Sequence, residues 1–273
     1  MRRRSSRKYI RLGRGEFDGR FAQKETKGTK TSLFVAFCSE RVEPMHPWRK
    51  ELIPTQFSSF DGLVAAAADL LKSHFQLPCS VPHAVMLSGG RTPLPIYDVL
   101  IQNPVRVSKM LHILFTDERM VPTTSEESNA GRVFPMLSAL GVSSSSILGV
   151  DTELPLEEAV EAYDKVIAEF LDRGGRVTLA LLGVGSDGHT ASLFSMDDIE
   201  RSRGRWAVGV RRKDGPDRVS VSADTIAKAE HAVILAAGKE KRDVVERMRT
   251  HPEKVVAAHA VKDAQNAELW YCG

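Results

Sequence analysis

From residue 45 onward the hydrophobic positions of the chain follow two patterns that alternate. Apolar residues spaced three and four apart predict helices at 60–75, 93–101, 128–140, 155–173, 223–230 and 239–250. Short runs dominated by apolar residues predict strands at 83–88, 111–116, 177–183, 206–210, 217–222, 231–238 and 267–272. An opening strand and turn is expected within residues 46–56.

This alternation predicts the fold class. Strands that are apolar throughout and alternate with helices indicate a mainly parallel sheet buried between helices. The expected fold is therefore α/β, a three-layer α/β/α sandwich with a mainly parallel sheet. The sequence has no internal repeat and no linker after residue 45, so residues 45–273 are expected to form a single domain.

The amino-terminal segment differs from the rest of the chain in charge. Residues 1–30 contain eleven Lys and Arg residues against three acids, whereas the whole chain has a formal net charge of +3. The segment is thus +8 and the remainder −5. We expect residues 1–44, which include a strand-like run at 32–39, to be a basic, disordered extension or a transit peptide, with Met45 as a candidate start of the functional chain. A negative remainder does not favour a nucleic-acid surface.

Cysteine usage and hydropathy predict the compartment. The three cysteines, Cys38, Cys79 and Cys272, are far apart and form no CxxC pair, which argues for a reducing compartment and against a disulfide framework or a zinc site. No stretch of eighteen apolar residues occurs, so no membrane span is expected. We therefore expect a cytoplasmic protein.

Three of the predicted strands end in loops that can carry chemistry. In an open parallel sheet, ligands bind beyond the carboxyl ends of the strands. The first loop, "SGGRTP" (88–93), combines two glycines with hydroxyls and a following helix start, which suits a phosphate. A tight strand-to-helix turn without a ligand explains the same residues.

The second loop is "FTDERMVP" (115–122), which places Asp117, Glu118 and Arg119 just past an apolar strand. An arginine at this position suits a sugar oxygen or a developing oxyanion. The alternative is a solvated, charged loop that caps the next helix.

The third loop lies within "LLGVGSDGHTASLF" (181–194), where an apolar strand stops at Gly183 and Gly185 and is followed by Asp187 and His189. A histidine at a strand end, with a carboxylate to orient it, is a candidate general base. The alternative is an ordinary surface histidine. No GxSxG elbow, HExxH helix or P-loop lysine competes with this pair in the sequence.

Together these segments resemble the signature segments of the 6-phosphogluconolactonase family. The resemblance rests on "LSGGRTP", "TDER" with the following "SN", and "LGVGSDGHTASLF", and continues through "DRVSVSADTIAKAEHAVILAAGKEK". It spans about residues 50–250. The glucosamine-6-phosphate deaminases share this layout, but they typically have an acidic residue followed by tyrosine where this chain has Glu118–Arg119. The family also usually has proline after "SLF", where this chain has Ser195.

The resemblance implies the fold of the glucosamine-6-phosphate deaminase, ribose-5-phosphate isomerase and CoA-transferase group. It implies hydrolysis of 6-phosphoglucono-1,5-lactone to 6-phosphogluconate (EC 3.1.1.31) in the oxidative pentose phosphate pathway, without a metal or cofactor. His189 is then expected to activate water, Asp187 to hold its ring and Arg119 to stabilise negative charge. The residues expected to bind the substrate and its phosphate are Ser88, Gly89, Gly90, Arg91, Thr92, Asp117, Lys241 and Arg218.

Two other functions remain open from the sequence. One is a sugar-phosphate isomerase or deaminase on the same scaffold, and the other is a sugar-phosphate sensor without turnover. The Asp187–His189 pair together with Arg119 argues against the sensor. The expected partner is the sugar phosphate lactone alone, with no nucleic acid and no membrane, and the chain is expected to be a monomer or a weak homo-oligomer.

Overall fold

The computed structural model describes residues 52–273, which belong to the second of the two units into which the chain divides, His46–Gly273. The expectations for residues 1–44, for the run at 32–39 and for a start at Met45 lie outside the described residues. Within the described part, no helix is both long and apolar enough to cross a bilayer.

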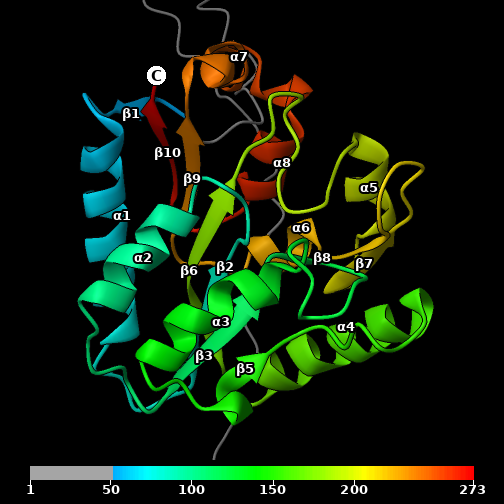
Figure 1. Ribbon diagram of the computed structural model, residues 1–273. Coiled ribbons are helices and arrows are strands. Elements are labelled where there is room, and N and C mark those ends of the chain that lie inside the picture. The colour runs from blue at the N-terminus through cyan, green and yellow to red at the C-terminus, as the bar shows by residue number, and fades with distance from the viewer. Residues whose placement is uncertain (1–51) are drawn as a thin grey trace, which may run out of the picture. The chain divides into compact units, whose positions relative to one another are not determined.

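Seven parallel strands form the central sheet (Figure 1). Their order from edge to edge is β1 (Pro54–Gln56), β10 (Ala267–Cys272), β9 (Ala232–Ala237), β6 (Arg176–Gly183), β2 (His83–Leu87), β3 (Leu111–Phe115) and β5 (Ile147–Leu148). The chain leaves β2 toward β3 and β5 but returns to β6, on the other side of β2. The direction of winding therefore reverses at β2 and β6, where open α/β sheets bind their ligands beyond the carboxyl ends of the strands.

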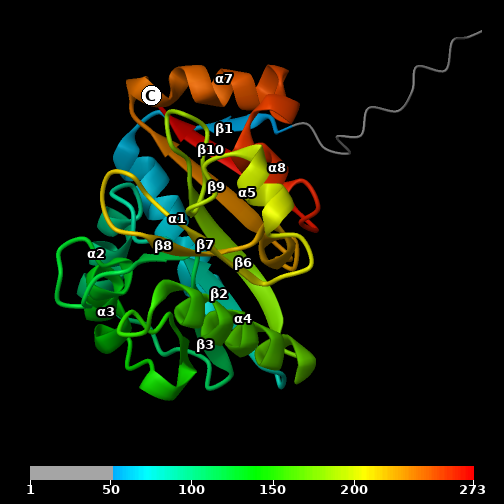
Figure 2. The same cartoon turned by 90° about the vertical axis from the view of Figure 1, so that its right-hand side faces the viewer.

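Helices contribute to the core on both faces of this sheet, as the three-layer prediction requires (Figures 1 and 2). One face carries α1 (Phe60–Phe75), α2 (Leu94–Gln102) and α3 (Asn129–Ala139). The other face carries α4 (Leu156–Asp172), α5 (Met196–Arg201), α6 (Ala223–Ile226), α7 (Arg242–Thr250) and α8 (Val256–Val261). Three single-turn 3-10 helices complete the described part: η1 (Ser144–Ser146), η2 (Lys239–Lys241) and η3 (Pro252–Lys254).

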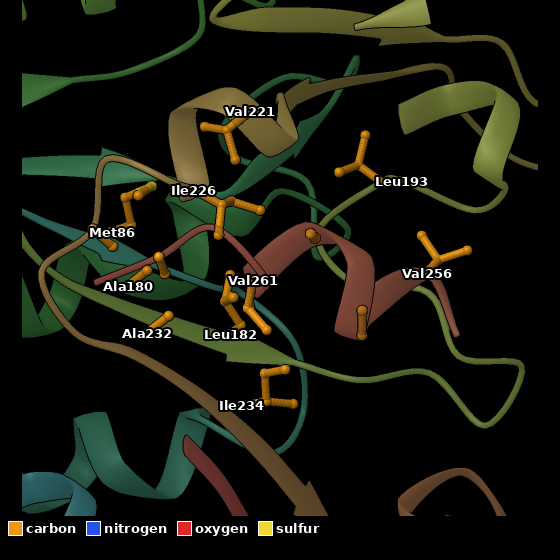
Figure 3. Packing of buried hydrophobic residues seen from close by; sticks show 14 of the residues in the cluster. Met86, Ala180, Leu182, Leu193, Val221, Ile226, Ala232, Ile234, Val256 and Val261 are labelled. Atoms are coloured by element: carbon orange, nitrogen blue, oxygen red, sulfur yellow. The ribbon is translucent and has the colours of Figure 1, made fainter. Parts of the chain in front are cut away.

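Successive side chains of each strand point to opposite faces of the sheet, so each apolar run feeds two separate cores. In β2, Ala84 and Met86 belong to the core under α4 to α8, whereas Val85 and Leu87 belong to the core under α1 to α3. Figure 3 shows the first of these cores, in which strand residues lie beside residues of α6 and α8. Each fully buried Val, Leu, Ile or Met side chain stabilises the folded state by about 1.5–3 kcal/mol relative to an exposed one. This explains why the central strands have no polar face.

A second, three-stranded antiparallel sheet packs on the α4 side, in the order β4 (Asp117–Arg119), β8 (Arg218–Val221), β7 (Ala207–Val210). The sequence analysis placed residues 115–122 in a loop, and this was wrong for Asp117–Arg119. These residues pair along β8, and the Asp117 and Glu118 side chains are buried. The charged run is therefore a strand within the core region rather than a solvated loop.

Most of the other predicted elements are confirmed, and the exceptions have local causes. The helix predicted at 60–75 has these bounds in the structure. The helix predicted at 223–230 ends at Ile226, because Ala229 and Glu230 leave it to pair with Val177 at the start of β6. The predicted helix at 239–250 is divided into η2 and α7. The two-residue strand β5 and the six-residue helices α5 and α8 were not predicted, because their periodic pattern is too short to detect.

Candidate active site

A cavity of about 1000 Å³ opens beyond the carboxyl ends of β2, β6 and β9, where the winding of the sheet reverses. Its lining includes six cationic side chains, those of Arg91, Arg119, Arg132, Arg218, Lys239 and Lys241, against the carboxylates of Asp117, Glu127 and Glu240. With neutral histidine the cavity is thus about +3, whereas the chain beyond residue 30 is −5. A cationic cavity in an acidic domain favours an anionic ligand.

His189 lies in this cavity and is held by Asp187 from the same loop. Asp187 Oδ1 lies 2.6 Å from His189 Nδ1 and accepts the His189 amide at 3.2 Å. Partial burial raises the pKa of Asp187, but these contacts with His189 outweigh it and leave the pKa below its usual range. Because the carboxylate faces Nδ1, that nitrogen carries the proton of the neutral ring. Nε2 is then left with its lone pair, in a side chain that is 31% exposed.

Glycine is required at two positions for this loop to form. A Cβ on Gly185 would overlap the His189 ring and the Asp187 carboxylate, so a larger residue there would displace the pair. Gly188 has a φ of +100°, a backbone conformation that side chains disfavour. Ala191, which lines the cavity, has a φ of +50° and is the only non-glycine residue of the described part with positive φ. The loop is thus built for one geometry of the Asp–His pair.

The loop after β2 divides its residues between packing and the cavity. Ser88 Oγ is buried; it donates to the Leu181 carbonyl at 2.9 Å and lies 3.0 Å from Thr116 Oγ1. A Cβ on Gly89 would lie 2.5 Å from Asn129 Cβ, so Gly89 allows the start of α3 to pack against this loop. These contacts show that the Ser88 hydroxyl and Gly89 serve the contacts between loops and strands.

The following residues, Gly90, Arg91 and Thr92, line the cavity itself at the start of α2. Arg91 is exposed and Thr92 is half-buried. The helix begins after Pro93 without a side-chain cap. Pro95 has no amide hydrogen, and the amides of Ile96 and Tyr97 donate to the Pro93 carbonyl at 3.0 and 3.2 Å, which leaves the Leu94 amide at the helix start. The positive end of the helix dipole, with an arginine beside it, favours a phosphate or a carboxylate.

Asp117 joins three segments of the site. Its carboxylate accepts Ser192 Oγ at 2.7 Å and Asn129 Nδ2 at 3.0 Å. Glu118 points elsewhere and accepts the amides of Asn129 and Ala130 at 2.8 and 2.7 Å, which caps the start of α3. The first acid of the "DER" run therefore holds the histidine loop to α3, and the second stabilises that helix through its amides and dipole.

Arg119 and Arg218 lie directly opposite one another in the antiparallel pair of β4 and β8. Arg119 donates to the Glu127 carbonyl at 2.6 Å, yet the Nε atoms of both arginines are buried without a hydrogen-bond partner. Burial lowers the pKa of Arg218, and the neighbouring positive charge of Arg119 lowers it further. Two adjacent guanidinium groups with unpaired donors form an arrangement that an anion stabilises.

Lys241 reaches the cavity from the turn after β9. Its Nζ donates to Ser186 Oγ at 3.3 Å, and Arg247 donates to the Ser186 carbonyl at 3.1 Å. Both contacts tie η2 and α7 to the loop that carries Asp187 and His189. Lys241 is thus placed beside the histidine loop, and its assignment to the substrate phosphate stays a prediction.

The cavity brings together most of the residues that the sequence indicated. Nine of them line it: Ser88, Gly90, Arg91, Thr92, Asp117, Arg119, His189, Arg218 and Lys241. Gly89 and Asp187 lie behind this lining and support it. The sequence analysis missed Arg132 and Lys239, which also line the cavity, and Ser192, whose hydroxyl holds Asp117. Their positions next to the recognised segments are the only sequence signal they give.

Within residues 52–273, no three His, Cys, Asp or Glu side chains are grouped so as to hold a metal ion. The cavity offers an oriented imidazole, several guanidinium and ammonium groups, and the start of α2. This fold and this site are those of an α/β enzyme for small anionic substrates.

The chain belongs to the family described as glucosamine-6-phosphate isomerases/6-phosphogluconolactonase, whose model matches residues 60–270. It is 33% identical over 158 residues to a 6-phosphogluconolactonase of Thermotoga maritima, an alignment that covers 58% of this chain and 70% of the relative. It is 32% identical over 163 residues to a 6-phosphogluconolactonase of Rattus norvegicus, covering 58% of this chain and 63% of the relative.

Solved structures agree with the sequence relatives. The crystal structure of a 6-phosphogluconolactonase from Thermotoga maritima superposes with a TM-score of 0.68 at 25% identity, and the match covers 81% of this chain and 99% of that one. The expected α/β fold and the expected family are thereby confirmed.

Proposed function

We propose that this chain hydrolyses 6-phospho-D-glucono-1,5-lactone to 6-phospho-D-gluconate, which makes it a 6-phosphogluconolactonase. The observation that carries the proposal is the Asp187–His189 pair, whose free Nε2 lies in a cationic cavity. The relatives that carry this name support the choice of substrate.

In the proposed reaction His189 acts as the general base. Nε2 takes a proton from a water molecule as the water oxygen attacks the lactone carbonyl carbon. The resulting imidazolium is stabilised by Asp187, whose carboxylate is ionised at neutral pH because its pKa is lowered. The tetrahedral intermediate then collapses, the bond from the carbonyl carbon to the ring oxygen breaks, and the imidazolium returns the proton to that oxygen. One water is consumed and the base is regenerated.

Negative charge develops on the carbonyl oxygen during the attack. We assign its stabilisation to Arg119, whose buried Nε lacks a partner, with Arg218 beside it. Preorganised donors of this kind act strongly in a site that is partly shielded from water. Asp117 acts indirectly in this proposal, by holding the histidine loop through Ser192.

The substrate phosphate is assigned to the other basic group of the cavity. Arg91, Thr92 and the start of α2 lie on one side, and Lys241 lies on the side of the histidine loop. The buried hydroxyl of Ser88 and the packed Gly89 support this region from behind. In this arrangement the phosphate is bound away from the reacting carbonyl.

A sugar-phosphate isomerase or deaminase of the same family is the competing function. The discriminating experiment is to supply the purified full-length chain with 6-phosphogluconolactone and, separately, with glucosamine 6-phosphate. We expect acceleration of lactone hydrolysis above the spontaneous rate and no ammonia release from the amino sugar. Ammonia release without lactone hydrolysis would replace the proposal by a deaminase, and binding without either reaction would replace it by a sensor.

The setting of this activity is part of the same proposal. We place the enzyme in the cytoplasm and in the oxidative pentose phosphate pathway, and assign catalysis to residues 45–273 acting as a monomer or a weak homo-oligomer. A chain that begins at Met45 is expected to turn over the lactone like the full chain.

A further inference from the structure

The proposed catalytic imidazole has a second neighbour besides Asp187. The ring centroids of His189 and Phe194 lie 4.6 Å apart, with 41° between the ring planes. The guanidinium carbon of Arg212 lies 4.2 Å from the centroid of the same Phe194 ring. Phe194 therefore contacts both the imidazole and a cation.

The contact with Phe194 restricts a rotation of the imidazole that its hydrogen bond to Asp187 still permits. A hydrogen bond at Nδ1 fixes one atom of the imidazole but permits the ring to turn about that bond. Packing against a flat aromatic ring limits this rotation, and with it the direction in which Nε2 points. Phe194 and Arg212 line a second cavity of about 590 Å³ rather than the cationic one.

The backbone of Phe194 is itself fixed by the start of α5. Its amide donates to Asp198 Oδ2 at 3.0 Å, and the Ser195 amide donates to the same oxygen at 2.9 Å. Ser195 in return accepts the Asp198 amide, which completes a capping box around the helix start. Ser195, the departure from the usual proline of the family, thus helps to hold Phe194 in place.

Arg212 differs from the arginine beside it. Arg211 pairs with Glu157 and lies 3.8 Å from Asp217, as expected for a surface ion pair. In the described part of the chain the Arg212 guanidinium makes no ion pair; it lies over the Phe194 ring, and its charge also acts on Arg218. A cation over the face of an aromatic ring favours that arrangement of the two side chains.

We propose that Phe194 and Arg212 are positioning residues for His189, with Phe194 setting the plane of the imidazole and Arg212 fixing Phe194. This inference rests on the proposed role of His189 as general base.

The first experiment compares Phe194→Leu with Phe194→Tyr in the full-length chain. Leucine keeps an apolar side chain but removes the flat ring, and we expect kcat for the lactone to fall about tenfold while KM changes little. Tyrosine keeps the ring and is expected to retain most of the activity. An equal loss in both variants, or a rise in KM without a fall in kcat, would contradict positioning through the ring.

The second experiment compares Arg212→Gln with Arg211→Gln, which removes the same charge one residue away. For Arg212→Gln we expect a several-fold lower kcat with little change in KM, since Phe194 loses the cation that contacts its ring. Arg211→Gln is expected to keep the wild-type kcat. An equal fall in kcat in both variants would mean that only the general surface charge matters and would contradict positioning by Arg212.

A third measurement separates this inference from the proposed function. In a His189→Ala background, Phe194→Leu is expected to have no further effect on the enzymatic rate above the spontaneous rate. If His189→Ala itself retains near-wild-type activity, the general-base assignment fails. If His189→Ala is inactive but Phe194→Leu alone is fully active, only the positioning inference fails.

Discussion

Histidines lie at both ends of the strands of the central sheet, here called the amino edge and the carboxyl edge. The two environments differ in whether a ring nitrogen is left without a partner. At the amino edge His83 is fully buried and both its nitrogens are in contact with other groups: Nδ1 lies 2.9 Å from Cys79 Sγ and Nε2 donates to the His74 carbonyl at 3.1 Å. At the carboxyl edge His189 has Asp187 on Nδ1 alone, and its side chain is 31% exposed.

The difference teaches what separates a structural histidine from a catalytic one. Burial, together with the nearby His231 and His83, lowers the pKa of His74 to about 4, and burial also lowers the pKa of His83. The amino edge therefore keeps its rings neutral at the cost of accessibility, and its hydrogen bonds serve stability. The carboxyl edge pairs a carboxylate with one nitrogen and leaves the other beside the cavity, which is what proton transfer requires.

The largest effect is expected from removing the imidazole at the carboxyl edge. His189→Ala should lower kcat for the lactone by about 10²–10⁴-fold, because a positioned general base supplies roughly this factor. The assay must subtract spontaneous hydrolysis, and circular dichroism should show an unchanged fold. His251→Ala, which removes a surface histidine, serves as the control. A variant that keeps near-wild-type kcat would leave Asp187 acting through water as the candidate base.

The converse substitution breaks the amino edge. His83→Ala should lower the free energy of unfolding by about 2–4 kcal/mol, since it leaves a cavity and removes the hydrogen bonds of the ring to Cys79 and to the His74 carbonyl. Below the unfolding temperature, kcat and KM should stay near their wild-type values. Urea denaturation measures the first expectation and the lactone assay the second. A large loss of kcat in a folded variant would show that the two edges are coupled.

A smaller effect is expected from a substitution that separates phosphate binding from catalysis at the carboxyl edge. Lys241→Ala should raise KM about tenfold with little change in kcat, because a phosphate remote from the carbonyl is bound about equally in the ground and transition states. Lys165→Ala, an exposed lysine paired with Glu169 on α4, provides the matched loss of charge. An unchanged KM would remove Lys241 from the phosphate site.

The smallest effect concerns the pH dependence of stability at the amino edge. His74 has a folded pKa of about 4 and an unfolded value near 6.5, so between these values the unfolded chain binds more protons. Stability should therefore fall as the pH drops from 6.5 toward 4, by roughly 1 kcal/mol after solvent screening of the partly exposed ring.

Urea midpoints at pH 7 and pH 5 measure this slope of stability against pH. His74→Gln removes the titrating ring and should flatten it, whereas His251→Gln at the surface should leave it unchanged. A slope that persists in full in His74→Gln would assign the pH dependence to other groups, with His83 the first to consider because its pKa is shifted in the same direction.

The layered fold was predictable because its signal is strong and local. Strands such as β6 are apolar over their whole length, and α1 and α4 carry clear helical periodicity between recognisable ends. The three-stranded sheet was less visible, because "DER" contains three charged residues and forms a strand only through pairing with β8. Pairing between segments about a hundred residues apart leaves no periodic pattern in either segment.

For the candidate site, the sequence predicted which residues belong to it better than what each of them contacts. Glycine turns after strands located His189, Asp187 and the loop after β2, since those positions follow from the topology of a parallel sheet. The burial of the Ser88 hydroxyl and the support that Ser192 gives Asp117 depend on which loops meet, which a single sequence does not encode locally. The contact of Phe194 with Arg212 is hidden for the same reason.

The bond from Ser192 to Asp117 joins residues 75 positions apart, and that from Ser88 to Leu181 joins residues 93 apart. Helices form locally and early, whereas contacts between distant segments must await closure of long loops. The catalytic geometry therefore exists only in the last stage of folding. During refolding from denaturant, recovery of lactonase activity should lag behind recovery of the helical circular dichroism signal. The rate at which activity returns then measures how fast these loops dock.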